Sequence, residues 1–413
     1  MDILRFLTAG SVDDGKSTLI GRLLYDSKNI LIDQMEALER SSKNREDGSV
    51  DLALLTDGLR AEREQGITID VAYKYFSTPK RKFIIADAPG HIQYTRNMVT
   101  GASNSDLIII LIDARNGVIE QTKRHSIIAS LLNIPYVVVA INKMDLVDYS
   151  EHRYNEIVAQ YQEVAKSLNL KNVTFIPISA LNGDNIVDVS ENIKWYTGNT
   201  LLNLLETTEL QSSTNLTNGR FPVQLVLRPQ TDDLHDYRGY AGQIESGIFK
   251  KGDTIVVYPS GVSATISAIE VNNKLVQEAF APQSAVLHLE EDVDISRGDL
   301  IVKPDNLLKI NQEIEALVCW MDDKPMNLRN RYLLQHNTKV VPAMIKGIDY
   351  KLDVNTLEKQ TDITQARLNE VVKVQLKTAS PLAYDSYQQI RTNGGAILID
   401  ETSFVTVGAV LFI

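Results

Sequence analysis

The chain has 413 residues, of which 44% are hydrophobic and 23% charged, and its formal net charge is −11. These proportions are typical of a globular protein with two or three domains, and the acidic balance argues against a protein whose main task is to hold nucleic-acid phosphates. The single cysteine, Cys319, excludes an internal disulfide and a cysteine-based zinc site. No apolar run approaches the ~18 residues of a membrane span, and the first residues leave no room for a signal peptide, so we expect a cytoplasmic protein without membrane contact.

A phosphate-binding loop stands near the start of the chain. The stretch Gly10-Ser11-Val12-Asp13-Asp14-Gly15-Lys16-Ser17, followed by Thr18, has the pattern G-x-x-x-x-G-K-S. A β-prone run from Ile3 to Leu7 precedes it, and apolar residues follow it at helical spacing. Backbone N–H groups at the start of that helix would bind nucleotide phosphates. We expect Lys16 to reach the β- and γ-phosphates and the Ser17 hydroxyl to hold Mg²⁺.

A polar connection from Asp26 to Gly66 follows, and a connection of this length inside a compact domain is usually functional. It ends at Gly66-Ile67-Thr68, where a threonine after a phosphate loop is suited to bind Mg²⁺ as part of a switch that senses the γ-phosphate. Two strands, Ile67 to Ser77 and Lys82 to Ala86, are predicted to form a hairpin.

The second of these strands runs into Asp87-Ala88-Pro89-Gly90-His91, of which we predict Asp87, Ala88 and Pro89 to be a second switch. Asp87 is placed to hold Mg²⁺ through water, and the Gly90 amide to bind the γ-phosphate. His91 would be the catalytic residue that orients the attacking water.

A guanine-reading motif follows a later buried strand, Tyr136 to Ile141. It is Asn142-Lys143-Met144-Asp145, in which the aspartate can accept hydrogen bonds from N1–H and the 2-amino group of guanine, donors that adenine does not present in this arrangement. After a further strand, the backbone amides of Ser179-Ala180-Leu181 would meet the guanine O6. Strands that alternate with helices predict an α/β domain with a mostly parallel sheet. The sequence therefore predicts a GTPase domain that binds GTP and Mg²⁺.

The rest of the chain reads as β-structure. The segment Thr207 to Asn218 is rich in Ser, Thr and Asn and is predicted to be a linker. Short β-rich runs with glycine-containing turns then predict two β-barrels, the first of them opening with a strand from Phe221 to Leu227. We also expect a turn at Arg391 to Gly395 and a core position for Trp320. The expected domains are a phosphate-loop GTPase domain at residues 1–212 and β-barrels at residues 213–305 and 306–413.

With these elements in order, the chain resembles the translation-factor class of GTPases and, more closely, the GTPase (large) subunit of the heterodimeric bacterial sulfate adenylyltransferase. The resemblance covers essentially the whole chain. The stretches that carry it are Val12-Asp13-Asp14-Gly15, Leu52-Ala53-Leu54-Leu55, Gln65 to Tyr73, Gln93 to Met98, Ala140 to Ser150 and Arg238 to Gly242. That family usually has threonine in place of Ala88 and glutamate in place of Ile92, and neither change removes a phosphate or guanine contact.

The resemblance implies an elongation-factor-like architecture and a heterodimer with a small subunit. The small subunit would form adenosine 5′-phosphosulfate and pyrophosphate from ATP and sulfate, and this subunit would hydrolyse GTP to drive that reaction. One alternative is a translation-type GTPase that delivers aminoacyl-tRNA, which a basic second half would favour. Another is an enzyme fused to a kinase for adenosine 5′-phosphosulfate, which would need a second phosphate loop that we do not find before Ile413.

Overall fold

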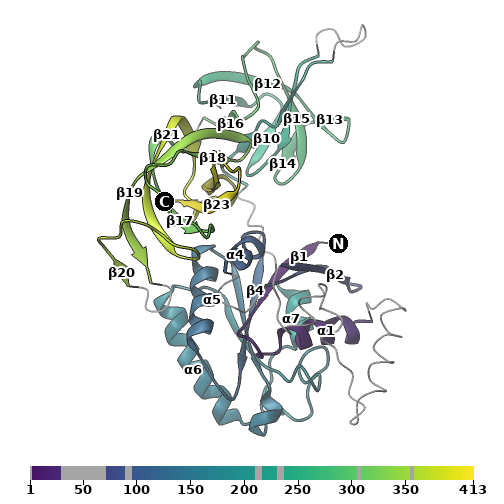
Figure 1. Cartoon of the computed structure of the whole chain (residues 1–413). Helices are drawn as coiled ribbons and strands as arrows, with labels where there is room; N and C mark the ends of the chain where they lie inside the picture. The colour runs from purple at the N-terminus through teal and green to yellow at the C-terminus, as the bar shows by residue number, and fades with distance from the viewer. Residues whose placement is uncertain are drawn as a thin grey trace. The chain divides into compact units, whose positions relative to one another are not determined.

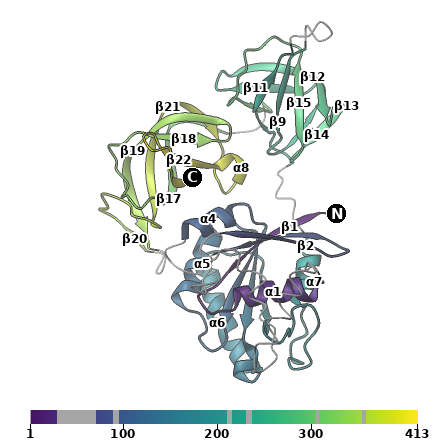
Figure 2. The ribbon, with the colours of Figure 1, turned by 45° about the vertical axis from the view of Figure 1, so that its right-hand side comes forward.

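The structure is a computed structural model. It describes residues 2–28, 71–88, 95–209, 216–229, 237–304, 308–353 and 358–413. The chain divides into two compact units, residues 1–210 and 211–413, and each can be followed by its colour in Figures 1 and 2. In the described ranges, no helix is long and apolar enough to cross a membrane.

The first unit is built on a six-stranded sheet in the order β2-β3-β1-β4-β5-β6. Its strands are β1 (Ile3–Ala9), β2 (Ala72–Ser77), β3 (Lys82–Asp87), β4 (Leu107–Asp113), β5 (Tyr136–Asn142) and β6 (Val173–Pro177). All pairs are parallel except β2 with β3, which form the expected hairpin. Every residue of β4 is buried, as expected for a strand with helices on both faces. The predicted α/β fold with a mostly parallel sheet is confirmed.

Helices cover both faces of this sheet (Figure 1). The helices are α1 (Lys16–Asp26), α4 (Thr95–Ser103), α5 (Glu120–Leu131), α6 (Glu151–Ser167) and α7 (Leu201–Thr207). α1 and α7 share a core cluster with Phe6 of β1. Successive strand residues point to opposite faces, so the next residue, Leu7, faces α4 instead, where a Cβ on Gly101 would lie 3.0 Å from the Leu7 Cδ1. Helices therefore cover both faces of the sheet, and a ligand is expected at the loops that follow the carboxyl ends of its strands.

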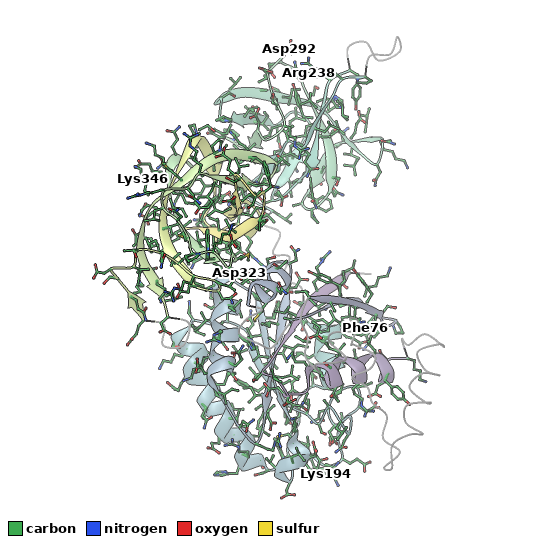
Figure 3. All side chains as sticks on the ribbon, in the orientation of Figure 1. Phe76, Lys194, Arg238, Asp292, Asp323 and Lys346 are labelled. Carbon is green, nitrogen blue, oxygen red and sulfur yellow. The ribbon has the colours of Figure 1, made fainter. Side chains whose placement is uncertain are left out.

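The second unit begins with antiparallel strands around one apolar core. They are β7 (Arg220–Pro222), β8 (Leu225–Leu227), β9 (Gly239–Gln243), β10 (Ile248–Lys250), β11 (Thr254–Tyr258), β12 (Val262–Val271), β13 (Lys274–Val276), β14 (Glu278–Phe280), β15 (Ser284–Leu289) and β16 (Leu300–Val302). At the surface of this barrel, Arg238 forms an ion pair with Asp292 and donates to the Val293 carbonyl at 2.8 Å (Figure 3). This contact gives Arg238 a structural role.

The prediction of one strand from Phe221 to Leu227 is wrong, because the chain changes pairing partners between β7 and β8. β7 pairs with β16, whereas β8 pairs with β9. Between them, the Val223 N–H donates to the Asp299 carbonyl at 2.8 Å and the Gln224 N–H donates to the Ala241 carbonyl at 2.9 Å. The two residues therefore form a corner of the barrel.

The remaining strands form a closed antiparallel barrel. They are β17 (Lys309–Trp320), β18 (Tyr332–His336), β19 (Lys339–Leu352), β20 (Lys359–Gln360), β21 (Val371–Tyr384), β22 (Gly395–Asp400) and β23 (Thr406–Phe412). The path β18-β22-β23-β17-β21-β19 closes because β18 also pairs with β19. Trp320 lies in its core at 2% exposure, as predicted. The two separate core clusters support the proposed division of residues 213–413 into two barrel domains.

The expected turn at residues 391–395 is a short helix, α8 (Arg391–Gly394), followed at once by β22. A Cβ on Gly394 would lie 2.3 Å from the Tyr387 Cα. The glycine therefore permits a close approach of two backbone segments, and the prediction that it serves a turn is wrong.

A buried ion pair joins the two barrels within the second unit. Arg220 of β7 is fully buried and donates from Nε and an Nη atom to the two carboxylate oxygens of Asp385, both at 2.8 Å. Asn393 donates to the same carboxylate at 2.7 Å. In addition, the Thr338 hydroxyl donates to the Val223 carbonyl at 2.9 Å. These contacts fix the two barrels to each other.

Candidate nucleotide-binding site

The phosphate loop lies between β1 and α1, which confirms the strand and helix predicted around it. Asp13 and Gly15 both have left-handed backbones, with φ of 67° and 92°. The Asp14 carboxylate accepts a hydrogen bond from the Ser11 N–H at 2.5 Å and so closes the loop on itself. Burial raises the pKa of Asp14. The chain between the two glycines is therefore held in one compact turn.

Lys16 lies folded into this loop. Its Nζ donates to the carbonyls of Gly10 at 3.1 Å and Ser11 at 3.3 Å, and the residue is 8% exposed. Burial lowers the pKa of Lys16, while nearby carboxylates, Asp87 first among them, oppose that shift. Ser17 and Thr18 follow in the first turn of α1 and are partly exposed. The ammonium group is thus placed over the loop whose N–H groups would meet phosphates.

Asp87 lies beside the phosphate loop because β3 pairs with β1, where Asp87 is opposite Thr8. Its side chain is 3% exposed, and it accepts a hydrogen bond from the Thr8 hydroxyl at 3.0 Å. Ala88 is buried and its N–H donates to the Thr8 carbonyl at 3.3 Å. The other predicted switch residues, Gly66, Ile67, Thr68 and Pro89, lie outside the described residues, as do the predicted phosphate-binding Gly90 and catalytic His91.

Asn142 connects the phosphate loop to the segment predicted to meet the base. At the end of β5 it is 1% exposed, its Nδ2 donates to the Asp14 carbonyl at 2.8 Å, and its Oδ1 accepts from the Ala180 N–H at 2.9 Å. A Cβ on Gly15 would lie 2.5 Å from the same Nδ2. One buried side chain therefore brings three predicted parts of the site together.

Lys143 lies between the phosphate loop and the carboxylate of Asp113, a residue that was not predicted from the sequence to be part of the site. The Lys143 backbone is left-handed, with φ of 61°, and its Nζ donates to the Asp13 carbonyl. The same Nζ is 3.0 Å from the Asp113 carboxylate, which Arg115 also binds at 2.6 Å. Burial would raise the pKa of Asp113, but the hydrogen bonds from Arg115 and Lys143 outweigh it and lower the pKa to about 2. Asp113 ends β4 opposite Asn142 of β5, and an acidic residue at the end of a buried strand beside the guanine motif was the available signal.

Asp145 lies in a single 3₁₀ turn, η3 (Met144–Val147), and is partly exposed. The turn is tied to the end of β6, because the Met144 N–H donates to the Ile178 carbonyl at 3.2 Å. Next along the chain, Ser179 and Ala180 are buried, while Leu181 is 58% exposed. Arg22 of α1 donates to the carbonyls of Ala180 and Leu181, an anchor that no local sequence pattern reveals. The structure thus brings the described members of the guanine set to one end of the sheet.

Comparison with known proteins places this geometry in a family. Residues 1–209 match the family model of the elongation factor Tu GTP binding domain, and residues 313–411 match the GTP-eEF1A C-terminal domain-like model. The chain is 52% identical over 401 residues to sulfate adenylyltransferase subunit 1 of Bacteroides fragilis, covering 97% of this chain and 83% of that protein. It is 51% identical over 414 residues to sulfate adenylyltransferase subunit 1 of Alteromonas mediterranea, covering 100% and 87%.

A third relative is longer. The chain is 52% identical over 408 residues to the bifunctional enzyme CysN/CysC of Mycobacterium tuberculosis, covering 98% of this chain but only 66% of that protein. The resemblance stated from the sequence is confirmed, as is its elongation-factor-like architecture of a GTPase domain followed by β-barrel structure. The chain carries a GTP-binding domain of the elongation factor Tu type and belongs to the sulfate adenylyltransferase subunit 1 family.

Proposed function

We propose that this chain is the GTP-hydrolysing subunit of a cytoplasmic sulfate adenylyltransferase. GTP hydrolysis would drive the formation of adenosine 5′-phosphosulfate and pyrophosphate from ATP and sulfate on a partner small subunit, the first step of sulfate activation. The observation that carries the proposal is the Asn142 contact between the phosphate loop and the Ala180 segment, in a chain about half identical to relatives named for this enzyme. The names of these relatives do not favour the alternative of a translation-type GTPase.

The described residues fit a guanine nucleotide and its Mg²⁺. Asn142 packs where a Cβ on Gly15 would stand and binds the Asp14 carbonyl, which holds the loop in shape, and Lys16 supplies the positive charge. Residues 10–18 would hold the phosphates, and Ser17, Thr68 and Asp87, the last through water, would hold Mg²⁺. The metal ion supplies charge neutralisation at the phosphate oxygens.

The base and the hydrolytic water have separate residues in this proposal. Asp145 would accept from N1–H and the 2-amino group of guanine, Asn142 and Lys143 would hold the loops around the base, and the amides of Ser179 to Leu181 would donate to O6. Gly90 would bind the γ-phosphate and His91 would orient the attacking water, with residues 66–68 and 87–89 acting as switches.

The test is GTP hydrolysis by the purified chain, alone and with a sulfate adenylyltransferase small subunit, with ATP and sulfate added or withheld. We expect hydrolysis to be slow alone and to rise when the partner, ATP and sulfate are all present, together with formation of adenosine 5′-phosphosulfate. Hydrolysis that ignores the partner but responds to ribosomes or tRNA would overturn the assignment and leave the GTPase chemistry in place.

A further inference from the structure

A polar cluster between residues 142–149 and 179–184, the two segments proposed to read the base, has no role in the proposed function so far. It consists of Tyr149, Asn182, Asp184, Ser190 and Asn192, and we call it the Asp184 cluster. The Asp184 carboxylate, 8% exposed, accepts from the Tyr149 hydroxyl at 3.0 Å, the Ser190 hydroxyl at 2.5 Å and the Asn192 amide at 3.2 Å. The Tyr149 oxygen in turn accepts from Asn182 at 3.3 Å.

We propose that the Asp184 cluster is a positioning device that holds segments 142–149 and 179–184 in one arrangement and thereby sets the affinity and selectivity for guanine nucleotides. The inference rests on the proposed function, because it takes Asp145 and the amides near Ala180 as the groups that read the base. None of the five side chains has to touch the nucleotide. They act through the backbone to which those groups belong.

The first support is the backbone on the Tyr149 side. Asp148 and Tyr149 are both left-handed, with φ of 51° and 52°, a conformation that costs energy for residues with side chains. Contacts hold this turn from both sides: the Tyr149 N–H donates to the Met144 carbonyl at 2.8 Å, and the Trp195 Nε1 donates to the Tyr149 carbonyl at 2.9 Å. The turn that carries Asp145 is therefore fixed at its far end by the residue that also reaches Asp184.

The second support is the backbone on the Asp184 side. The Ser179 N–H donates to the Asp184 carbonyl at 3.3 Å, and the Gly183 N–H donates to the Ser179 carbonyl at 2.8 Å. Asp184 thus closes the turn that contains Ala180 and Leu181. Besides the Asn142 contact with Ala180, the Asp184 carboxylate is a second side-chain group that joins the two segments, through Tyr149, 35 residues away in the sequence. The buried Asp184 carboxylate accepts hydrogen bonds from a few neutral donors. Because a buried acceptor that loses a donor is destabilised, these hydrogen bonds favour one geometry of the two segments.

Tyr149→Phe is the sharpest variant, because it removes the hydroxyl and keeps the ring. If about half of the free energy of a hydrogen bond to a charged group is lost from nucleotide binding, the Kd of GDP should rise about 10-fold, which corresponds to about 1.4 kcal/mol. Inosine diphosphate lacks the 2-amino group, so its Kd should rise less, and the preference for GDP over it should fall about threefold. The kcat at saturating GTP should stay within about twofold, since the phosphate side is untouched.

The measurement is competition of GDP and inosine diphosphate against a fluorescent GDP analogue on the full chain, with kcat and KM for GTP in parallel. Asp184→Asn should act in the same direction, and Ser190→Ala is a milder second variant if that protein fails to fold. Tyr161→Phe is the matched control, because this buried tyrosine also loses a hydrogen bond, to Ser126 at 2.8 Å, away from both segments. It should leave both Kd values unchanged.

Two outcomes separate this inference from the proposed function. Wild-type Kd values and selectivity in Tyr149→Phe and Ser190→Ala, with altered selectivity in Asp145→Asn, would overturn the positioning role and leave the function intact. Unaltered selectivity in Asp145→Asn would overturn the guanine-reading role and the present inference with it.

Discussion

Replacing Arg220 by methionine should destabilise the second unit strongly, because it leaves the Asp385 carboxylate buried without its cation. Arg220 is 0% and Asp385 4% exposed, and two hydrogen bonds of 2.8 Å join them. Removing one partner of such a buried pair typically costs about 3–5 kcal/mol. Asn393 still donates to the carboxylate, which places our expectation at about 3 kcal/mol. Replacing both residues, in Arg220→Met with Asp385→Leu, should cost less than the sum of the single changes.

Urea unfolding monitored by tryptophan fluorescence can test this in the full chain. The chain has two tryptophans, and Trp320 is 2% exposed in the second unit, so a Trp195→Phe background makes Trp320 the reporter. The control is Lys346→Met, which breaks the exposed ion pair with Glu313 and should change the midpoint little. A midpoint shift in Arg220→Met no larger than in Lys346→Met, or additive costs in the double variant, would refute the reasoning.

Three further predictions concern the site and pH. Asp145→Asn should shift nucleotide preference from guanine to xanthine, measured by competition binding, and retained guanine selectivity would contradict the proposed role. His91→Ala should lower kcat for GTP by roughly 10²–10⁴ with GDP affinity nearly unchanged, and normal turnover would contradict it. Burial lowers the pKa of His336 from 6.5 to about 4. Between pH 6.5 and 4, His336 binds a proton in the unfolded chain but stays neutral in the native chain. The free energy of unfolding should therefore fall by about 3 kcal/mol as the pH drops from 6.5 towards 4. His336→Gln should flatten that part of the urea-midpoint profile, and an unchanged slope would exclude this histidine as its source.

The sequence predicted those parts of the fold and site that depend on short patterns. The buried strand predicted from Tyr136 to Ile141 agrees within one residue with β5, Tyr136–Asn142, because a strand covered on both faces is apolar along nearly its whole length. The phosphate loop and the N-K-x-D motif were found because binding a phosphate or a base fixes residue types at short spacing. What was missed depends on contacts across the chain: Arg22 reaches the Ala180 carbonyl 158 residues away. No window of sequence contains both ends of such a contact.

Errors of local structure have the same origin. Gly394 was predicted to serve a turn because glycine is common in turns. The structure shows instead that the Tyr387 backbone packs against Gly394 and leaves no space for a Cβ. The predicted strand from Phe221 to Leu227 is divided because its first part pairs with β16 and its last part pairs with β9. In both cases the residue type was read correctly and the partner was unknown, and the partner decided the structure.

The same dependence on distant partners explains why two separate motifs constrain each other. Gly15 is fixed by its left-handed backbone and also by Asn142, whose Nδ2 lies where a Cβ would stand, 2.5 Å away. Asn142 needs that closeness, since the same Nδ2 binds the Asp14 carbonyl from 128 residues away. A side chain at position 15 would push Asn142 off both Asp14 and Ala180. The glycine of the phosphate motif and the asparagine of the base motif therefore depend on each other for packing. A change to either residue should weaken phosphate binding and base binding together.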